Sequence, residues 1–132
     1  WHTNRMNNAN KIWAAARQHK SIYVPIVPMH MVHAAYKCYV FVRETYLAEY
    51  WSRDRIVEEI NNLGVPCLSG SCSEVYLEAA FDNTEFRPKA RLPNAKELGE
   101  TSIVFLVHPN LTNVEIQQTC DAITSVIRLA TK

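Results

Sequence analysis

Hydrophobic residues recur every three or four positions at the start of the chain, and Asn, Arg and Lys fill the positions between them. This spacing is typical of an amphipathic helix, because residues three or four apart share one helix face. We therefore predict a helix over about residues 3–19. Pro25 and Pro28 follow it, and because proline cannot continue a helix, they predict an extended linker.

Three segments have the composition of strands. Residues 36–42 (YKCYVFV) are rich in β-branched and aromatic residues and are too short for a helix bounded in this way. Residues 65–68 are a shorter strand candidate. Residues 103–107 (IVFLV) are apolar without alternation, which indicates a strand covered on both faces. We expect this last segment to be the central strand.

The middle of the chain carries clear helix start and stop signals. Ser52 is a favoured N-cap residue, and Trp51 and Ile56 flank it as a hydrophobic staple. These residues predict a helix that begins at Arg53. Gly64 stands where a left-handed residue commonly ends a helix.

Three more helices are predicted after this point. The small-residue loop 68–73 ends in Ser73, a possible cap for a short helix through Ala80. Pro93 suits the first turn of a helix that continues to about Gly99. Thr112 and Glu115 have the spacing of a capping box, which predicts that the last helix starts there.

This order of elements predicts an α+β fold, a small three-stranded sheet packed against helices. No internal repeat, low-complexity tract or long linker divides the chain, so residues 1–132 are expected to form a single domain. The chain opens on Trp1 and runs at once into a helical pattern. We therefore expect it to be a fragment, the C-terminal domain of a longer protein.

Composition narrows the class of protein. The 14 Lys and Arg residues nearly balance the 13 Asp and Glu residues, so the basic excess that phosphate backbones select for is missing and nucleic acid is an unexpected partner. No apolar run approaches the roughly 18 residues that a membrane-spanning helix needs, and the polar start is not a targeting peptide. We expect a cytoplasmic protein with no membrane partner.

The cysteines and histidines leave alternatives open. The four cysteines, without a CxxC pair, are interpreted as buried thiols. A zinc site from His30, His33, Cys67 and Cys72 is disfavoured by its spacing, so no metal is expected. Cys72 would be a nucleophile only with a base close in space, and a small apolar turn residue is the favoured reading.

Other patterns favour structural interpretations. Trp1, Trp13 and Trp51 are expected to be packing anchors, because aromatic side chains dominate core burial. Glu58 and Glu59 fall on the exposed face of a predicted helix and do not form an acid–base pair. Three glycines are too few and too dispersed for a glycine-rich phosphate loop.

Several segments in order resemble a known family. Residues 92–98 (LPNAKEL) and 107–112 (VHPNLT) are similar to a signature near the end of sugar aminotransferases of the DegT/DnrJ/StrS type, with matching spacing. Upstream, residues 33–42 resemble the first strand of that family's small domain. Arg53-Asp54 resembles a helix start, and Gly64-Val65 the turn before a short strand. The resemblance covers about residues 4–129.

The resemblance implies the small C-terminal domain of an enzyme that uses pyridoxal 5′-phosphate (PLP) to move an amino group onto a keto sugar, usually nucleotide-linked. It also implies a larger PLP-binding domain of the same chain and a homodimer. The Schiff-base lysine and phosphate-binding residues would belong to that larger domain, because no lysine here lies in a matching context. The isolated fragment is therefore expected to bind no cofactor, to have no catalytic residue and to be inactive.

The chain departs from the family between Gly64 and Phe81. Gly70-Ser71 occupies the place of the family's His-Tyr pair, and Tyr76 that of a second His, residues that lie beside the substrate. The loop can still hydrogen-bond hydroxyls. An ordinary strand-to-helix turn capped by Ser73 is an equal alternative. The candidate substrate-binding residues are Tyr36, Lys37, Ser69, Ser71, Glu74 and Tyr76.

Two other functions remain open. A non-catalytic module that binds a small ligand or regulates another protein fits the same order of elements. A zinc-binding interaction domain is a further alternative. If a larger domain packs here, an apolar patch should lie on one side of the sheet around Tyr39 and Phe41.

Overall fold

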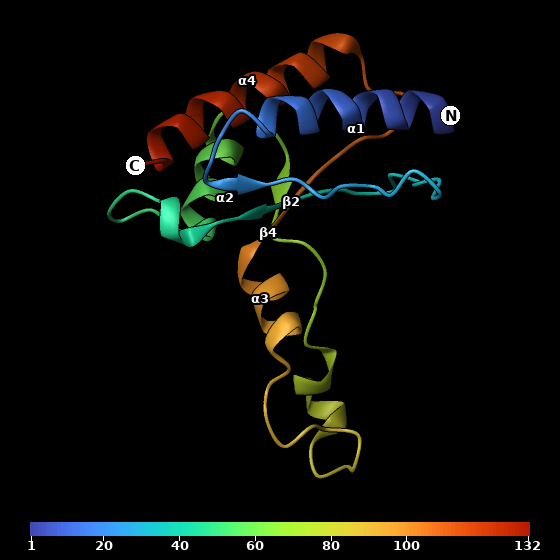
Figure 1. Ribbon diagram of the computed structural model, residues 1–132, viewed down its shortest axis with the longest axis vertical. Helices are drawn as coiled ribbons and strands as arrows, with labels where there is room; N and C mark the ends of the chain where they lie inside the picture. Colours follow the sequence, from blue (N-terminus) through green and yellow to red (C-terminus); the bar gives the residue numbers. More distant parts are fainter.

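The computed structural model describes residues 1–132 and has an α+β fold, which confirms the class expected from the sequence (Figure 1). The helices are α1 (His2–Ala16), α2 (Arg53–Asn62), α3 (Pro93–Thr101) and α4 (Asn113–Ala130). The strands are β1 (Ile22–Tyr23), β2 (Cys38–Val42), β3 (Cys67–Leu68) and β4 (Ser102–Phe105). Single turns of 3-10 helix span Glu44–Tyr46, Val75–Leu77 and Ala79–Phe81.

The sheet is antiparallel with the strand order β1-β2-β4-β3, one strand more than the three expected. The additional strand is β1, whose two residues pair with Phe41 and Val42 of β2. Two residues carry no periodicity, and Pro25 follows almost at once, so the sequence indicated only an extended linker there. β4 lies inside the sheet and all four of its residues are buried, as expected for the central strand.

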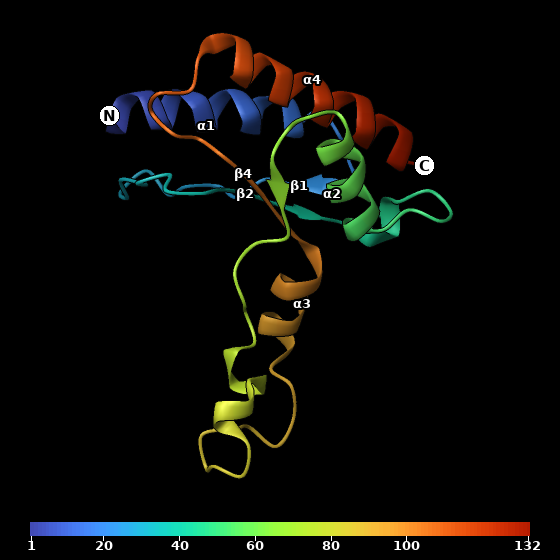
Figure 2. The ribbon, with the colours of Figure 1, turned by 180° about the vertical axis from the view of Figure 1, so that it is seen from behind.

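Helices cover one face of the sheet. Figures 1 and 2 show α1 and α4 side by side above the strands, with α2 close to the C-terminal half of α4. Alternate residues of β2, Cys38, Val40 and Val42, are buried beneath this layer with Ile12 of α1 and Ile123 of α4. Burial of each aliphatic side chain of this size stabilises the domain by roughly 1.5–3 kcal/mol.

The other face of the sheet carries a row of aromatic rings. The ring centre of Phe41 lies 6.2 Å from those of both Tyr23 and Tyr39, and the Phe41 and Tyr39 rings are stacked. Phe41 and Tyr39 are half-buried, and Leu98 of α3 lines the same cavity as these two rings. No helical layer comparable to α1 and α4 covers this face (Figure 1).

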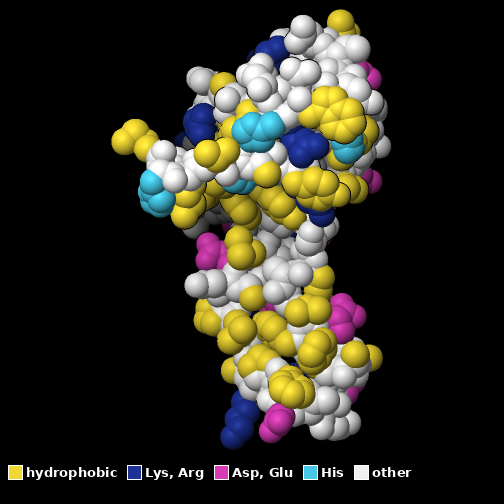
Figure 3. Space-filling view, turned by 90° about the vertical axis from the view of Figure 1, so that its right-hand side faces the viewer, with side chains coloured by type: hydrophobic (Ala, Val, Ile, Leu, Met, Phe, Trp, Pro, Cys, Tyr) yellow, Lys and Arg dark blue, Asp and Glu magenta, His cyan; other side chains and the backbone are white.

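We call the side of the sheet that carries Tyr23, Tyr39 and Phe41 the aromatic face. Residues 69–101, which we call the arm, project from this face and away from the helix layer (Figures 1 and 2). The arm runs down through the two 3-10 turns and returns along α3. Tyr76 is its one buried residue. Figure 3 shows hydrophobic side chains along the arm and up to the sheet. The large exposed ones are Val75, Leu77, Phe86, Leu92 and Leu98.

The helix ends follow the local signals closely. Ser52 accepts a hydrogen bond from the backbone N–H of Arg55, and α2 begins at Arg53 as predicted. Gly64 has a φ of +78°, the left-handed conformation expected after this helix. Thr112 and Glu115 form both bonds of the capping box at the start of α4.

Other expectations required correction. In place of one short helix through Ala80, two separate 3-10 turns form, and Ser73 caps neither of them. Trp1 is 90% exposed and is not a packing anchor, whereas Trp13 lies in the core and the half-buried Trp51 packs against it, as expected. Cys72 is exposed, although a buried thiol was expected.

The structure has no group of three or more His, Cys, Asp or Glu side chains that could hold a metal ion. No helix combines the length and the apolar character that a membrane span requires.

Candidate functional site

The candidate site is a crevice between the aromatic face of the sheet and the root of the arm. It encloses about 240 Å³. β2 contributes Tyr39 and Phe41, the start of the arm contributes residues 71–73, and α3 contributes Leu98. The crevice therefore combines apolar walls with several hydroxyl groups, a mixture suited to a ligand with both polar and apolar faces.

Three polar groups meet at one edge of this crevice. Lys37 Nζ donates a hydrogen bond to Ser71 Oγ at 2.9 Å, and Tyr39 Oη lies 3.2 Å from the same oxygen. Lys37 and Ser71, both proposed from the sequence, are thus in direct contact although 34 residues separate them. Together the groups offer several donors and acceptors, which a hydroxyl-rich ligand requires.

Gly70 brings the arm close enough for these contacts. Its φ is +103°, a conformation that favours glycine. An added Cβ would stand 2.9 Å from Ser102 Oγ and 3.1 Å from Tyr39 Cε1. The backbone approaches the sheet closely here because residue 70 has no side chain.

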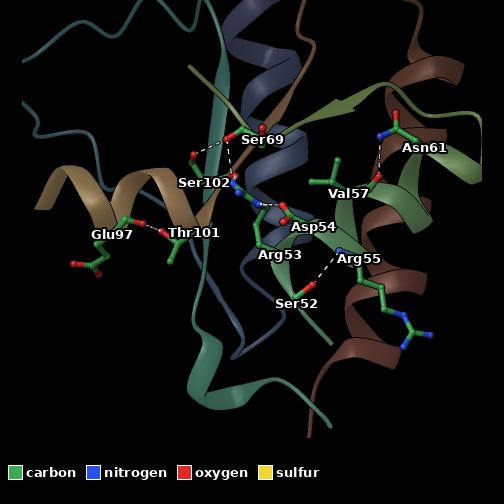
Figure 4. Close-up of polar contacts among 10 residues, drawn as sticks. All are labelled: Ser52, Arg53, Asp54, Arg55, Val57, Asn61, Ser69, Glu97, Thr101 and Ser102. Carbon is green, nitrogen blue, oxygen red and sulfur yellow. Dashed lines mark hydrogen bonds and ion pairs between the residues drawn. The ribbon is translucent and has the colours of Figure 1, made fainter. Parts of the chain in front are cut away.

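Ser69 contributes its backbone to this arrangement. Its carbonyl oxygen accepts a hydrogen bond from Ser102 Oγ at 2.6 Å and another from Arg53 Nη1 at 3.3 Å (Figure 4). The Ser69 side chain is exposed and does not line the crevice. Ser69, one of the candidate substrate-binding residues, thus contributes to this region through its carbonyl oxygen.

Tyr36 lies at a second, larger recess of about 630 Å³. Lys37 lines this recess as well, and its Nζ binds Ser71, which lines the crevice. Arg5 and His108 also line it, and no Asp or Glu does. Its floor is apolar, formed by Leu68, Val104, Phe105 and Leu106.

Glu74 and Tyr76 lie further along the arm and bind each other. Tyr76 Oη donates to Glu74 Oε1 at 2.7 Å and accepts from the backbone N–H of Leu92 at 2.9 Å. Arg91 forms an ion pair with the same carboxylate. This cluster joins the two sides of the arm, and none of its hydrogen bonds reaches Lys37 or Ser71.

The same contacts determine how these groups titrate. Hydrogen bonds from Arg91 and then from Tyr76 lower the pKa of Glu74 to about 2. Desolvation and the neighbouring Glu74 raise the pKa of Tyr76. Glu74 is thus a carboxylate over the ordinary pH range, and its negative charge is matched by Arg91.

Sequence reasoning missed four residues of the crevice region. Tyr39 and Phe41 were singled out only as members of an apolar patch, yet they form a wall of the crevice. Their alternation with the buried residues of β2 was the available signal. Ser102 and Leu98 come from segments distant in the sequence, and no local pattern connects them to Ser71.

The thiols divide into two groups. Cys38, Cys67 and Cys120 are buried. Burial raises the pKa of Cys38 and of Cys67 to about 12, and Cys120 adds to the effect at Cys38. The pKa of Cys120 is also raised by burial. Cys72 lines the crevice, and its Sγ lies 3.7 Å from Glu78 Oε1, a carboxylate and not one of the His, Lys or Arg side chains that activate a cysteine nucleophile.

Solved structures define the class of the fold, the small α+β domain of aminotransferases. The aminotransferase from Psychrobacter cryohalolentis is 51% identical over 97% of this chain, with a TM-score of 0.91. A DegT DnrJ EryC1 StrS aminotransferase from Brucella abortus is 17% identical over 94% of the chain, with a TM-score of 0.75. The fold implied by the resemblance of the sequence to the DegT/DnrJ/StrS family is thus confirmed.

A third structure shares the fold alone. It is the E. coli GDP-4-keto-6-deoxy-D-mannose-3-dehydratase with bound hydrated PLP, 14% identical over 92% of the chain, with a TM-score of 0.72. The chain spans 34%, 30% and 30% of these three proteins respectively, about one third of their length. No family model matches the chain, and no curated protein matches it significantly.

Proposed function

We propose that this chain is the small C-terminal domain of a cytoplasmic, PLP-dependent aminotransferase that transfers an amino group to a keto sugar, usually nucleotide-linked. The observation that carries the proposal is the 51% identity with an aminotransferase over nearly the whole chain. Fold alone would not support an activity, because the same fold occurs in a dehydratase. The contribution of this domain is substrate shaping and packing against the larger domain.

PLP would be held by the remainder of the polypeptide. Lys37 is the lysine that binds the crevice residue Ser71, and the recess that it lines contains no carboxylate to pair with a pyridine nitrogen. The residues present therefore do not fit the cofactor. PLP supplies an electron sink for reactions at the amino-bearing carbon, and this chemistry requires a lysine and an oriented ring. Alone, the fragment should be inactive.

Lys37, Tyr39 and Ser71 would bind the substrate. Their donors and acceptors meet at one edge of the crevice, where a sugar hydroxyl could replace the contact between Lys37 and Ser71. The stacked ring of Phe41 provides a flat apolar wall, against which the less polar face of a sugar ring packs well. Tyr36 would extend the site into the neighbouring recess.

The aromatic face and the arm would be covered by the larger domain of the same chain. About two thirds of the length of the similar aminotransferase lies outside the matched region, enough for a domain larger than this one. The arm has one buried residue and five large exposed apolar side chains, and exposed apolar surface of this extent marks an interface. We also expect the complete protein to be a homodimer.

Assay of the complete protein tests the proposal. The PLP-loaded protein is mixed with amino acid donors and with GDP-4-keto-6-deoxy-D-mannose as a probe sugar, and amino-sugar formation is followed by mass spectrometry. We expect amination that requires PLP and is lost when the larger domain is removed. If the complete protein binds no PLP but small metabolites raise its unfolding temperature, the alternative of a ligand-binding or regulatory module is correct instead.

A further inference from the structure

Arg53 places a charged side chain where little water reaches it. Its side chain is only 13% exposed. The guanidinium donates from Nη1 to the carbonyl oxygen of Ser102 at 2.9 Å and to that of Ser69 at 3.3 Å, while Nε pairs with Asp54 at 2.6 Å (Figure 4). Arg53 thus ties the first turn of α2 to the place where β3 ends and β4 begins.

The side chain of Ser102 also binds the carbonyl group of Ser69. Its hydroxyl donates to the Ser69 oxygen at 2.6 Å, and Ser102 itself is 4% exposed. The Ser69 carbonyl therefore accepts two hydrogen bonds, one of them from a cation. Hydrogen bonds to charged groups are roughly twice as strong as those between neutral groups. The peptide that leads into Gly70 is consequently fixed in orientation.

The direction of this peptide determines where Ser71 lies. Gly70 follows at once, and its close approach to Ser102 and Tyr39 leaves no room for the turn to shift toward the sheet. Ser71 Oγ then arrives within hydrogen-bond distance of Lys37 Nζ and Tyr39 Oη. A continuous series of contacts therefore runs from the start of α2 to the edge of the crevice.

We propose that Arg53 is a positioning residue for the substrate crevice, which acts with Ser102 through the Ser69 carbonyl to hold the Ser71 hydroxyl beside Lys37 and Tyr39. This inference rests on the proposed function, since it takes the crevice as the sugar site. Lysine cannot replace Arg53 in this role. A single ammonium group lacks the planar fork that reaches two carbonyls and a carboxylate at once.

The test uses the complete PLP-loaded protein with Arg53→Lys, and with Arg55→Lys as the matched control. Arg55 lies two residues further along α2, and it stacks on Trp51 and does not reach the Ser69 carbonyl. Crystal structures give the distance between Ser71 Oγ and Lys37 Nζ in each variant. We expect this contact to be lost in Arg53→Lys and kept in Arg55→Lys.

Kinetics with the probe sugar provide the second readout. We expect Arg53→Lys to raise KM about tenfold and to change kcat much less, as lost ground-state contacts do. Ser102→Ala removes the other donor and should shift KM in the same direction, which keeps the test valid if Arg53→Lys folds poorly. An intact contact between Ser71 and Lys37 in both variants, or a lower unfolding temperature with unchanged KM, overturns the proposal.

The outcomes also separate this inference from the proposed function. If the wild-type protein aminates no sugar, the proposed function fails, and the crystal structures still report whether Arg53 positions Ser71. If the wild-type protein is active and Arg53→Lys has the wild-type KM, the positioning role fails and the proposed function remains.

Discussion

Gly70 lies so close to Ser102 that a Cβ on residue 70 would stand 2.9 Å from the Ser102 hydroxyl oxygen. That hydroxyl is already committed to the carbonyl of Ser69 at 2.6 Å. The side chain at 102 therefore cannot turn away without losing a buried hydrogen bond. The close approach of the arm to the sheet depends on both residues together.

Gly70→Ala should destabilise the domain by about 2–4 kcal/mol. The substitution adds strain at a φ of +103° and forces Ser102 or Tyr39 to move. Gly64→Ala is the matched control, since Gly64 has a φ of +78° and no atom within 4 Å of an added Cβ. Strain alone predicts a loss of about 1–2 kcal/mol there.

Urea unfolding of the two variants measures the difference. Gly70→Ala combined with Ser102→Ala should cost less than the sum of the two single substitutions, because the closest clash is with the Ser102 hydroxyl. Equal losses for Gly70→Ala and Gly64→Ala would show that the close approach has no energetic weight.

The parts of the fold that could be predicted are those with local causes. Ser52 and Gly64 delimit α2, and Thr112 with Glu115 starts α4, because capping bonds join residues only three positions apart. The uninterrupted apolar segment of β4 likewise identified a strand inside the sheet. In each case the residues that form the interaction lie in one short window of the sequence.

The arm and the complete site could not be predicted for the opposite reason. The contact between Lys37 and Ser71 spans 34 residues, and the contact between Arg53 and Ser102 spans 49. β1 is held by pairing with β2, and its two residues have no pattern of their own. The family resemblance singled out the loop that contains Ser69 and Ser71, whereas the contacts of Glu74 and Tyr76 within the arm required the structure.

Tyr76→Phe should loosen the arm while the sheet remains intact. The substitution removes the bond to Glu74 and leaves the N–H of Leu92 without its acceptor. A net loss of about 1 kcal/mol corresponds to about fivefold faster amide exchange in residues 74–92, followed by mass spectrometry. Tyr36→Phe is the control, because Tyr36 is exposed and belongs to neither side of the arm. The same exchange rate in both variants would contradict the structural role of Tyr76.

Acid should weaken the arm through Glu74. Its pKa is about 2 in the folded chain, against an ordinary value of 4.5, because Arg91 and Tyr76 bind the carboxylate. The stabilisation is therefore complete above about pH 4.5 and is lost as the pH falls toward 2. Pepsin cleavage of the arm should accelerate over this interval. Glu74→Gln corrects for the pH dependence of pepsin itself, and a constant ratio of wild-type to variant cleavage would contradict the prediction.

Cys72 should be the first thiol in this domain to react with iodoacetamide. It is exposed, whereas Cys38 and Cys67 are buried with pKa values of about 12, so that few of their thiols ionise near neutral pH. Alkylation at pH 8, quantified for each cysteine by mass spectrometry, should therefore modify Cys72 at least tenfold faster than the buried thiols. Cys72→Ser should abolish the fast phase and leave the slow phase unchanged.

The same experiment tests whether the larger domain covers the region around Cys72. Slow modification of Cys72 in the complete protein, with fast modification in the isolated domain, would support such an interface. Rapid modification of Cys38 in the folded domain would contradict the division of the thiols into two groups.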